Sequence, residues 1–195
     1  MQGLKDEEVM LKYKQGETEA MDELLRRYKN PIYHFALRLT ADATESQDIA
    51  QEVFLRLHQY RAGYAVLGKF STWIFSIAHN LCISRLRRKK WQCFWPRRDD
   101  EDEGLVDFAS SELSPEETAS NNEMSLLLKK SIQGLPFLQK EALVLREYHN
   151  LDYQEISSIL KKSLGTVKTL IHRARLSLKK KLLPYLKEEA GGIDV

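Results

Sequence analysis

The stretch Lys161–Lys181 constrains the fold most strongly. It holds eight Lys or Arg residues and no acidic residue. Its apolar residues recur at spacings of three and four, which place them along one side of a helix. They are Val167, Leu170, Ile171, Ala174, Leu178 and Leu182. One side of this helix is therefore expected to pack on protein and the other to be cationic. Such a helix fits the major groove of DNA, although its composition fits a solvated surface helix equally well.

The rest of the sequence favours an all-α protein. A chain of 195 residues can hold one domain or two small ones, and only nine Gly and five Pro interrupt its helical spacing. No apolar run approaches the ~20 residues that span a bilayer, and the N-terminal segment lacks the apolar block of a signal peptide. We therefore expect a cytoplasmic location.

Charge divides the chain into three parts. Residues 1–90 carry a net +4, residues 91–125 a net −8, and residues 126–195 a net +6. Five consecutive acids, Asp99–Glu103, oppose packing. We therefore predict two small helical domains, residues 1–91 and 126–187, joined by a flexible acidic linker at 92–125 and followed by a tail at 188–195. Two basic blocks of this kind suggest a polyanion partner.

The first block predicts several helices. One spans about residues 6–15, and a second starts near residue 17 and is expected to break at Asn30-Pro31. A third continues from Pro31, and residues 40–43 form another break. The helix at 45–60 displays a distinct outer face, made of Asp48, Gln51, Glu52, Leu55, Arg56 and Gln59. That face is either simply solvated or a docking surface for another protein.

The segment from Lys69 to Lys90 predicts a second nucleic-acid surface. It holds six cations and no acid, and Tyr64, Phe70 and Trp73 stand at its start. Cations follow phosphates and aromatic rings stack on unpaired bases, so this combination suits single-stranded nucleic acid. The alternative is that Phe70 and Trp73 belong to the core and that the terminal cations serve the helix dipole.

The second block predicts a helix-turn-helix. Helices are expected near residues 123–135 and 137–149. Asp152 and Glu155 then form a capping box that starts a helix. The residues Lys161–Leu164 separate it from the basic helix described first. Two short helices with a tight turn, the second of them basic, are typical of DNA binding.

These motifs, in this order, resemble the extracytoplasmic-function (ECF) branch of bacterial RNA polymerase sigma factors from about Leu11 to Leu183. The segment Asp48–Phe54 resembles the family's segment for docking on the polymerase. The segment from Phe70 to Arg88 resembles its segment for melting and reading the minus-ten element. The segment from Gly165 to Arg175 resembles its recognition helix for the minus-thirty-five element.

The resemblance implies a role for each surface. The docking face named above would bind core polymerase. In the C-terminal helix, four residues would reach base edges: Lys168, Thr169, His172 and Arg173. Four others would hold phosphates: Thr166, Arg175, Lys179 and Lys180. The opened strand would meet a pocket and a basic helix end, comprising Tyr64, Lys69, Phe70, Thr72, Trp73, Ser76, His79, Asn80, Arg85, Arg87 and Arg88. The family also implies an inhibitory anti-sigma factor, usually bound to the membrane.

Two segments depart from the family's usual pattern. Thr169-Leu170 stands where the family commonly has Ser-Arg, which removes a cation and buries Leu170. Ala65–Gly68 stands where the loop is often polar with Arg-Gly. The resemblance therefore implies the role but not the promoter sequence.

Other classes of protein account for less of the sequence. A stand-alone helix-turn-helix regulator would use the C-terminal domain but leave the 45–60 and 69–90 surfaces without a task. An enzyme acting on DNA would need a clustered nucleophile, base and metal set, which residues 1–125 do not offer. His79, Cys82 and Cys93 match no common zinc spacing. We expect no catalytic site, metal, cofactor or small-molecule substrate, and we expect Cys82 to lie in a helix core.

Overall fold

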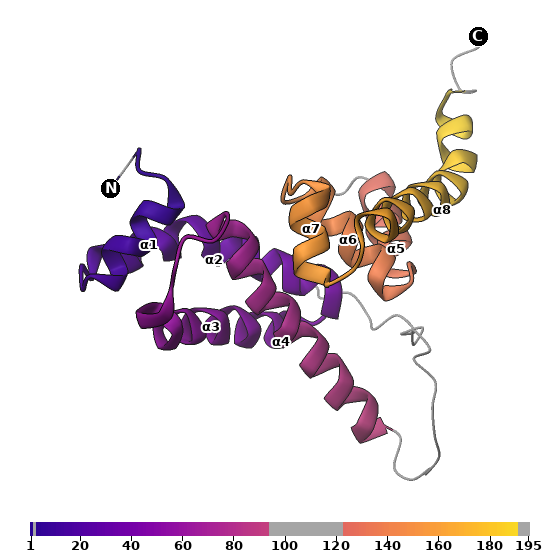
Figure 1. Cartoon of the computed structure of the whole chain (residues 1–195). Helices are drawn as coiled ribbons and strands as arrows, with labels where there is room; N and C mark the ends of the chain where they lie inside the picture. The colour runs from indigo at the N-terminus through magenta and orange to yellow at the C-terminus, as the bar shows by residue number, and fades with distance from the viewer. Residues whose placement is uncertain (2, 94–122, 191–195) are drawn as a thin grey trace.

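The computed structural model describes residues 1, 3–93 and 123–190, which form helices and turns without a strand in those ranges (Figure 1). The N-terminal elements are α1 (Asp6–Lys14), α2 (Glu19–Thr40), α3 (Ala43–Tyr60), the 3-10 turn η1 (Arg61–Gly63) and α4 (Phe70–Cys93). The C-terminal helices are α5 (Glu123–Gln133), α6 (Phe137–Glu147), α7 (Tyr153–Leu160) and α8 (Leu164–Ala190). The predicted all-α architecture with two helical domains is confirmed. The acidic run and most of the predicted linker lie outside the described residues.

The predicted break at Asn30-Pro31 is wrong. Helix α2 runs without interruption from Glu19 to Thr40 with Pro31 in its interior. A proline there removes one backbone hydrogen bond and costs about 3 kcal/mol. The same helix buries Tyr28, Ile32 and Phe35 along one face. Each large apolar side chain contributes about 1.5–3 kcal/mol on burial, so the packing of this face outweighs the proline.

The predicted break after this helix is confirmed. Ala41 ends α2 in the left-handed conformation, with φ of 56°. Asp42 then caps α3, because its carboxylate accepts a hydrogen bond of 3.0 Å from the backbone N–H of Glu45. This short turn makes α2 and α3 an antiparallel pair, against which α4 packs.

The two domains share one continuous apolar cluster. It contains Phe35 and Phe75 of the N-terminal helices together with Val144, Leu151 and Ile156 of the C-terminal helices. Helix α4 packs against α7, and α2 packs against α6. Figure 1 shows α7 beside α4, whereas the long helix α8 projects away from the N-terminal helices.

Cys82 lies in this core, as predicted. Its side chain is buried, and burial raises the pKa of the thiol. Among the described residues, no group of three His, Cys, Asp or Glu side chains is arranged to hold a metal ion. None of the described helices combines the length and apolar character needed to cross a bilayer.

Candidate nucleic-acid interface

A helix-turn-helix forms at the predicted place. Asp152 accepts a hydrogen bond of 2.8 Å from the backbone N–H of Glu155, and the Glu155 carboxylate accepts one of 2.8 Å from the backbone N–H of Asp152. This capping box starts α7. Lys161 ends α7 with φ of 52°, and α8 begins at Leu164. The tight turn therefore rests on a non-glycine residue in the left-handed region.

Helix α8 presents the two sides predicted from its spacing. Val167, Ile171 and Ala174 are buried, and Leu170, Leu178 and Leu182 are half-buried. The side chains predicted to face DNA are all exposed: Thr166, Lys168, Thr169, His172, Arg173, Arg175, Lys179 and Lys180. The exposed side therefore offers cations and hydrogen-bond donors, which suit phosphates and base edges.

Three of these residues already have local partners. The hydroxyl groups of Ser163 and Thr166 lie 2.8 Å apart, and Thr169 donates a bond of 2.9 Å to the carbonyl of Gly165. The Arg175 guanidinium contacts the carboxylate of Glu147 on α6 at 2.5 Å, and this bond raises the pKa of Arg175. Arg175 would have to exchange Glu147 for a phosphate, whereas Lys168 and Arg173 form no ion pair with any residue that the structure describes.

The aromatic residues before and within α4 form one stack. The ring centroids of Tyr64 and Trp73 are 5.1 Å apart, and those of Phe70 and Trp73 are 5.8 Å apart. Tyr64 and Phe70 are buried, whereas Trp73 is half-buried. The backbone N–H of Phe70 donates a bond of 2.7 Å to Glu7 of α1, which fixes the start of α4. Only Trp73 of the three rings is thus partly open to a base in this arrangement.

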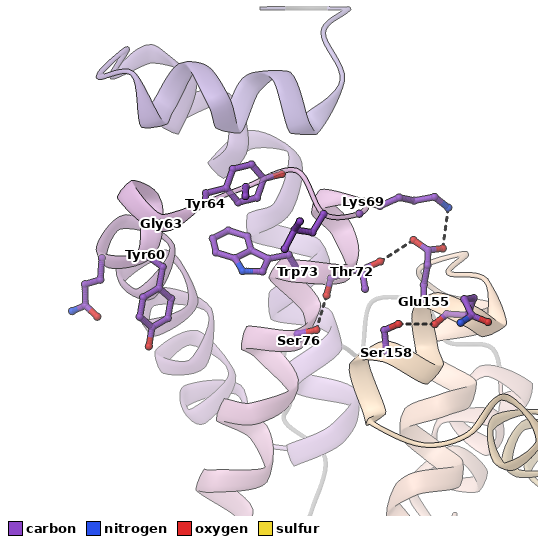
Figure 2. Close-up of a pocket in the computed structure, with 14 residues that line it drawn as sticks. Tyr60, Gly63, Tyr64, Lys69, Thr72, Trp73, Ser76, Glu155 and Ser158 are labelled. Atoms are coloured by element: carbon purple, nitrogen blue, oxygen red, sulfur yellow. Dashed lines mark hydrogen bonds and ion pairs between the residues drawn. The ribbon is translucent and has the colours of Figure 1, made fainter.

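A hollow of about 800 Å³ opens beside this stack. Figure 2 shows that one wall comes from Tyr60, Tyr64, Trp73 and Ser76, and the opposite wall from α7. Glu155 of α7 points across to α4: Thr72 donates to it at 3.1 Å, and Lys69 approaches its other oxygen at 3.1 Å. The carboxylate raises the pKa of Lys69. The hollow therefore lies between the two domains.

His79 and Asn80 lie on different sides of α4. His79 is buried, and its Nδ1 forms a hydrogen bond of 2.6 Å with the carboxylate of Glu141 on α6. Asn80 is exposed. Burial raises the pKa of Glu141, and the bond from His79 opposes that shift. The structure therefore brings Tyr64, Trp73 and Ser76 around one hollow but turns His79 toward the C-terminal domain.

The cations near the C-terminal end of α4 differ in their surroundings. Arg85 lies 3.5 Å from the carboxylate of Glu45 on α3, whereas Arg87 and Arg88 are exposed. The side chains of Lys89 and Lys90 lie outside what the structure describes.

The residues predicted to form a docking face lie on the outer side of α3. Asp48, Gln51, Leu55 and Gln59 are exposed, and Leu55 keeps 58% of its surface accessible. Glu52 and Arg56, also predicted there, are half-exposed and form an ion pair of 3.0 Å.

A groove of about 950 Å³ extends this face onto α2, which sequence reasoning missed. Met21, Leu25, Arg26 and Lys29 line it from α2, beside Gln51 and Leu55 of α3. The sequence signal was the spacing of four between the apolar residues Met21 and Leu25, which places them on one side of the helix; both are half-exposed in the structure.

Sequence reasoning also missed the acidic residues that face α4. Asp152 and Glu155 were identified only as a cap, and Glu141 was not singled out. No local pattern could have found them, because their partners lie between 62 and 84 residues away in the chain.

Comparisons with known proteins match both helical domains to known families. The Sigma-70 region 2 family matches residues 24–92, and the Sigma-70 region 4 family matches residues 125–178. The ECF RNA polymerase sigma factor SigW of Bacillus subtilis is 34% identical over 172 residues, which cover 87% of this chain and 92% of SigW. The RNA polymerase sigma-H factor of Pseudomonas aeruginosa is 31% identical over 188 residues, covering 94% of this chain and 96% of that protein.

Two solved structures share the fold. The sigma factor RpoE in complex with the anti-sigma factor NepR, from Bartonella quintana, has a TM-score of 0.66 and 21% identity, covering 83% of this chain and 95% of RpoE. CnrH in complex with the cytosolic domain of CnrY has a TM-score of 0.65 and 17% identity, covering 91% and 96%. On the sequence matches to regions 2 and 4 and the identity to SigW, the chain belongs to the ECF family of RNA polymerase sigma factors.

Proposed function

We propose that this chain binds core RNA polymerase and directs it to promoters. The observation that carries the proposal is the presence of both sigma regions in one chain, each ending in a separate cationic helix. A stand-alone regulator would need only the second region. The chain would act in the cytoplasm, where polymerase and promoter DNA meet.

The two cationic helices would contact different parts of the promoter. Helix α8 would hold duplex DNA at the minus-thirty-five element, with Lys168, Thr169, His172 and Arg173 at base edges. Each good base contact discriminates by about 1–3 kcal/mol. Contacts to phosphates from Thr166, Arg175, Lys179 and Lys180 would fix the register without reading sequence.

The α4 surface would receive the opened strand at the minus-ten element. Removing a base from the stack costs a few kcal/mol, which a receiving pocket must offset. The α4 wall of the hollow beside Trp73 would contribute to such a pocket. Asn80, exposed further along α4, can both donate to and accept from a base edge. Arg87 and Arg88 would follow the backbone beyond it.

Such a protein needs no catalytic centre of its own, because the polymerase supplies the chemistry. An anti-sigma factor is a further expected partner. RpoE of Bartonella quintana, which shares this fold, was solved in complex with the anti-sigma factor NepR, and CnrH was solved in complex with the cytosolic domain of CnrY. Covering the α3 and α4 surfaces would prevent both polymerase docking and strand capture.

Equilibrium binding to core polymerase tests the proposal at its first step. The wild-type chain should bind, and the double substitution Asp48→Lys and Glu52→Lys should weaken binding about tenfold or more, because charge reversal in an interface is costly. Reversing Glu17 and Glu19, both exposed outside the predicted face, is the matched control. Absence of any binding by the folded wild-type chain would refute the proposed function.

A further inference from the structure

The surface assigned to the opened strand is also the surface on which the two domains meet. Thr72 and His79 lie seven residues apart, on one side of α4. Each meets a carboxylate of the C-terminal domain: Glu155 lies 3.1 Å from the Thr72 hydroxyl, and Glu141 lies 2.6 Å from His79 Nδ1. The hollow beside Trp73 is closed on one side by Gln154, Glu155 and Ser158 of α7 (Figure 2).

At this interface, acidic groups at the start of α7 contact the hydrogen-bond donors of α4 and the loop before it that a nucleic-acid strand would use. Lys69 Nζ lies 3.1 Å from Glu155 and 3.4 Å from Asp152. Ser71 and Thr72 both direct their hydroxyl groups at one Glu155 oxygen. A phosphate offers the same negative charge and acceptor oxygens as these carboxylates. Glu155 and a strand backbone therefore compete for the same cation and hydroxyl groups.

Further contacts run across the same interface. The His149 ring packs on Phe35 and Phe75, with centroid distances of 5.8 Å and 4.6 Å. The Arg38 guanidinium lies 4.0 Å from the centre of the Tyr148 ring. Gln133 donates a bond of 3.0 Å to the carbonyl of Arg38. Three C-terminal helices and the loop after α6 thus take part, so the contact is more than one ion pair.

The interface also contains unsatisfied polar atoms. Among the described residues, the second carboxylate oxygen of Glu141 and the Nε2 of His149 are buried without a hydrogen-bond partner. Such groups make burial costly. The domains are therefore held by specific contacts but at an energetic cost that opening would relieve.

We propose that this is a self-inhibited arrangement, in which α6 and α7 cover the single-strand surface of α4 and must leave it before a promoter strand can bind. The exposed side of α8 carries the duplex-reading residues and stays uncovered. The arrangement thus blocks strand capture but leaves duplex recognition open. This inference rests on the proposed function for its identification of the α4 surface.

The distance between the domains gives the first test. Glu141→Lys places a cation beside His79 and should separate the domains, which X-ray scattering of the full chain detects as a larger radius of gyration. Glu147→Lys, on the same helix but paired with Arg175 of its own domain, is the matched control and should leave the radius unchanged. Circular dichroism verifies that each variant is folded.

A second variant covers the case in which Glu141→Lys does not fold. Lys69 is exposed, so Lys69→Glu should fold, and its carboxylate would face Asp152 and Glu155. It should also enlarge the radius of gyration. A wild-type chain whose scattering already fits separated domains, or folded variants with unchanged radii, would overturn the proposal.

Binding of a fluorescein-labelled single-stranded oligonucleotide of mixed sequence gives the second test. Glu141→Lys and Glu147→Lys change the net charge equally, and Glu147→Lys also releases Arg175, so non-specific attraction rises at least as much in the control. If the wild-type chain is about 90% closed, the open variant should bind about tenfold more tightly than the control, because apparent affinity scales with the competent fraction. Equal affinities in an opened chain would overturn the masking proposal. Binding to core polymerase is measured separately and tests the proposed function independently of the masking proposal.

Discussion

At the scale of single residues, Lys168 and Lys180 differ in their place along α8. Lys168 lies near the N-terminal end of α8, where a recognition helix reaches base edges, and Lys180 lies several turns further on. Both side chains are exposed, and neither substitution opens a cavity.

We predict that Lys168→Ala weakens binding by about 1–3 kcal/mol and relaxes sequence preference at one base pair. Lys180→Ala should weaken binding to all duplexes alike and reduce the salt slope by about one. Fluorescence anisotropy with the polymerase complex, on a bound promoter and its single-base variants, measures both. A uniform loss in Lys168→Ala would mean that this residue contacts phosphate.

Local patterns predicted the orientation of residues but not their distant partners. The exposed side of α8 and the capping box of α7 follow from spacings of three and four, which sequence displays directly. The pairing of Arg175 with Glu147 joins residues 28 positions apart, and that of His79 with Glu141 joins residues 62 apart. Such pairs depend on how helices pack, which no local pattern encodes.

At the scale of helices, α2 shows how packing overrides a local signal. Asn30-Pro31 predicts a break, yet the core contacts of Tyr28, Ile32 and Phe35 keep one helix through it. The continuous helix also carries Met21, Leu25 and Lys29 to the groove beside α3. The residues predicted to form the docking face lie on the surface, and the adjoining groove on α2 was not predicted, because the prediction considered a single helix.

At the scale of the whole molecule, charge predicted two basic blocks but not their contact. Phe75 and Ile156 are both buried in the shared cluster, and nothing in the sequence around them indicates that they pack against the other domain. The joint cluster shows that the domains bury part of their apolar surface against each other. The same contact brings His149 beside two rings of the N-terminal domain.

That position predicts a pH dependence. Burial, followed by the charges of Arg38 and His34, lowers the pKa of His149 to about 4 from an ordinary 6.5. Between these values the unfolded chain binds more protons than the folded chain. The free energy of unfolding therefore keeps its full value above pH 6.5. It decreases by up to about 3 kcal/mol as the pH falls through 4, because the folded state resists protonation of His149.

Urea unfolding at pH 7 and pH 4.5 measures this effect. The comparison is between the wild-type chain and His149→Phe, which keeps an aromatic ring but cannot titrate. The wild-type chain should lose more stability on acidification than the variant, since all other titratable groups are common to both. An identical loss in the two proteins would show that His149 does not carry the effect.

Transcription reconstituted with purified core polymerase tests the central claim most directly. A library of promoter-containing DNA fragments is transcribed with and without this chain, and the 5′ ends of the products are mapped. We predict discrete start sites that require the chain and share two sequence elements upstream. Failure to direct initiation from any fragment, together with tight binding of duplex DNA by the chain alone as a dimer, would contradict the account and identify a stand-alone regulator.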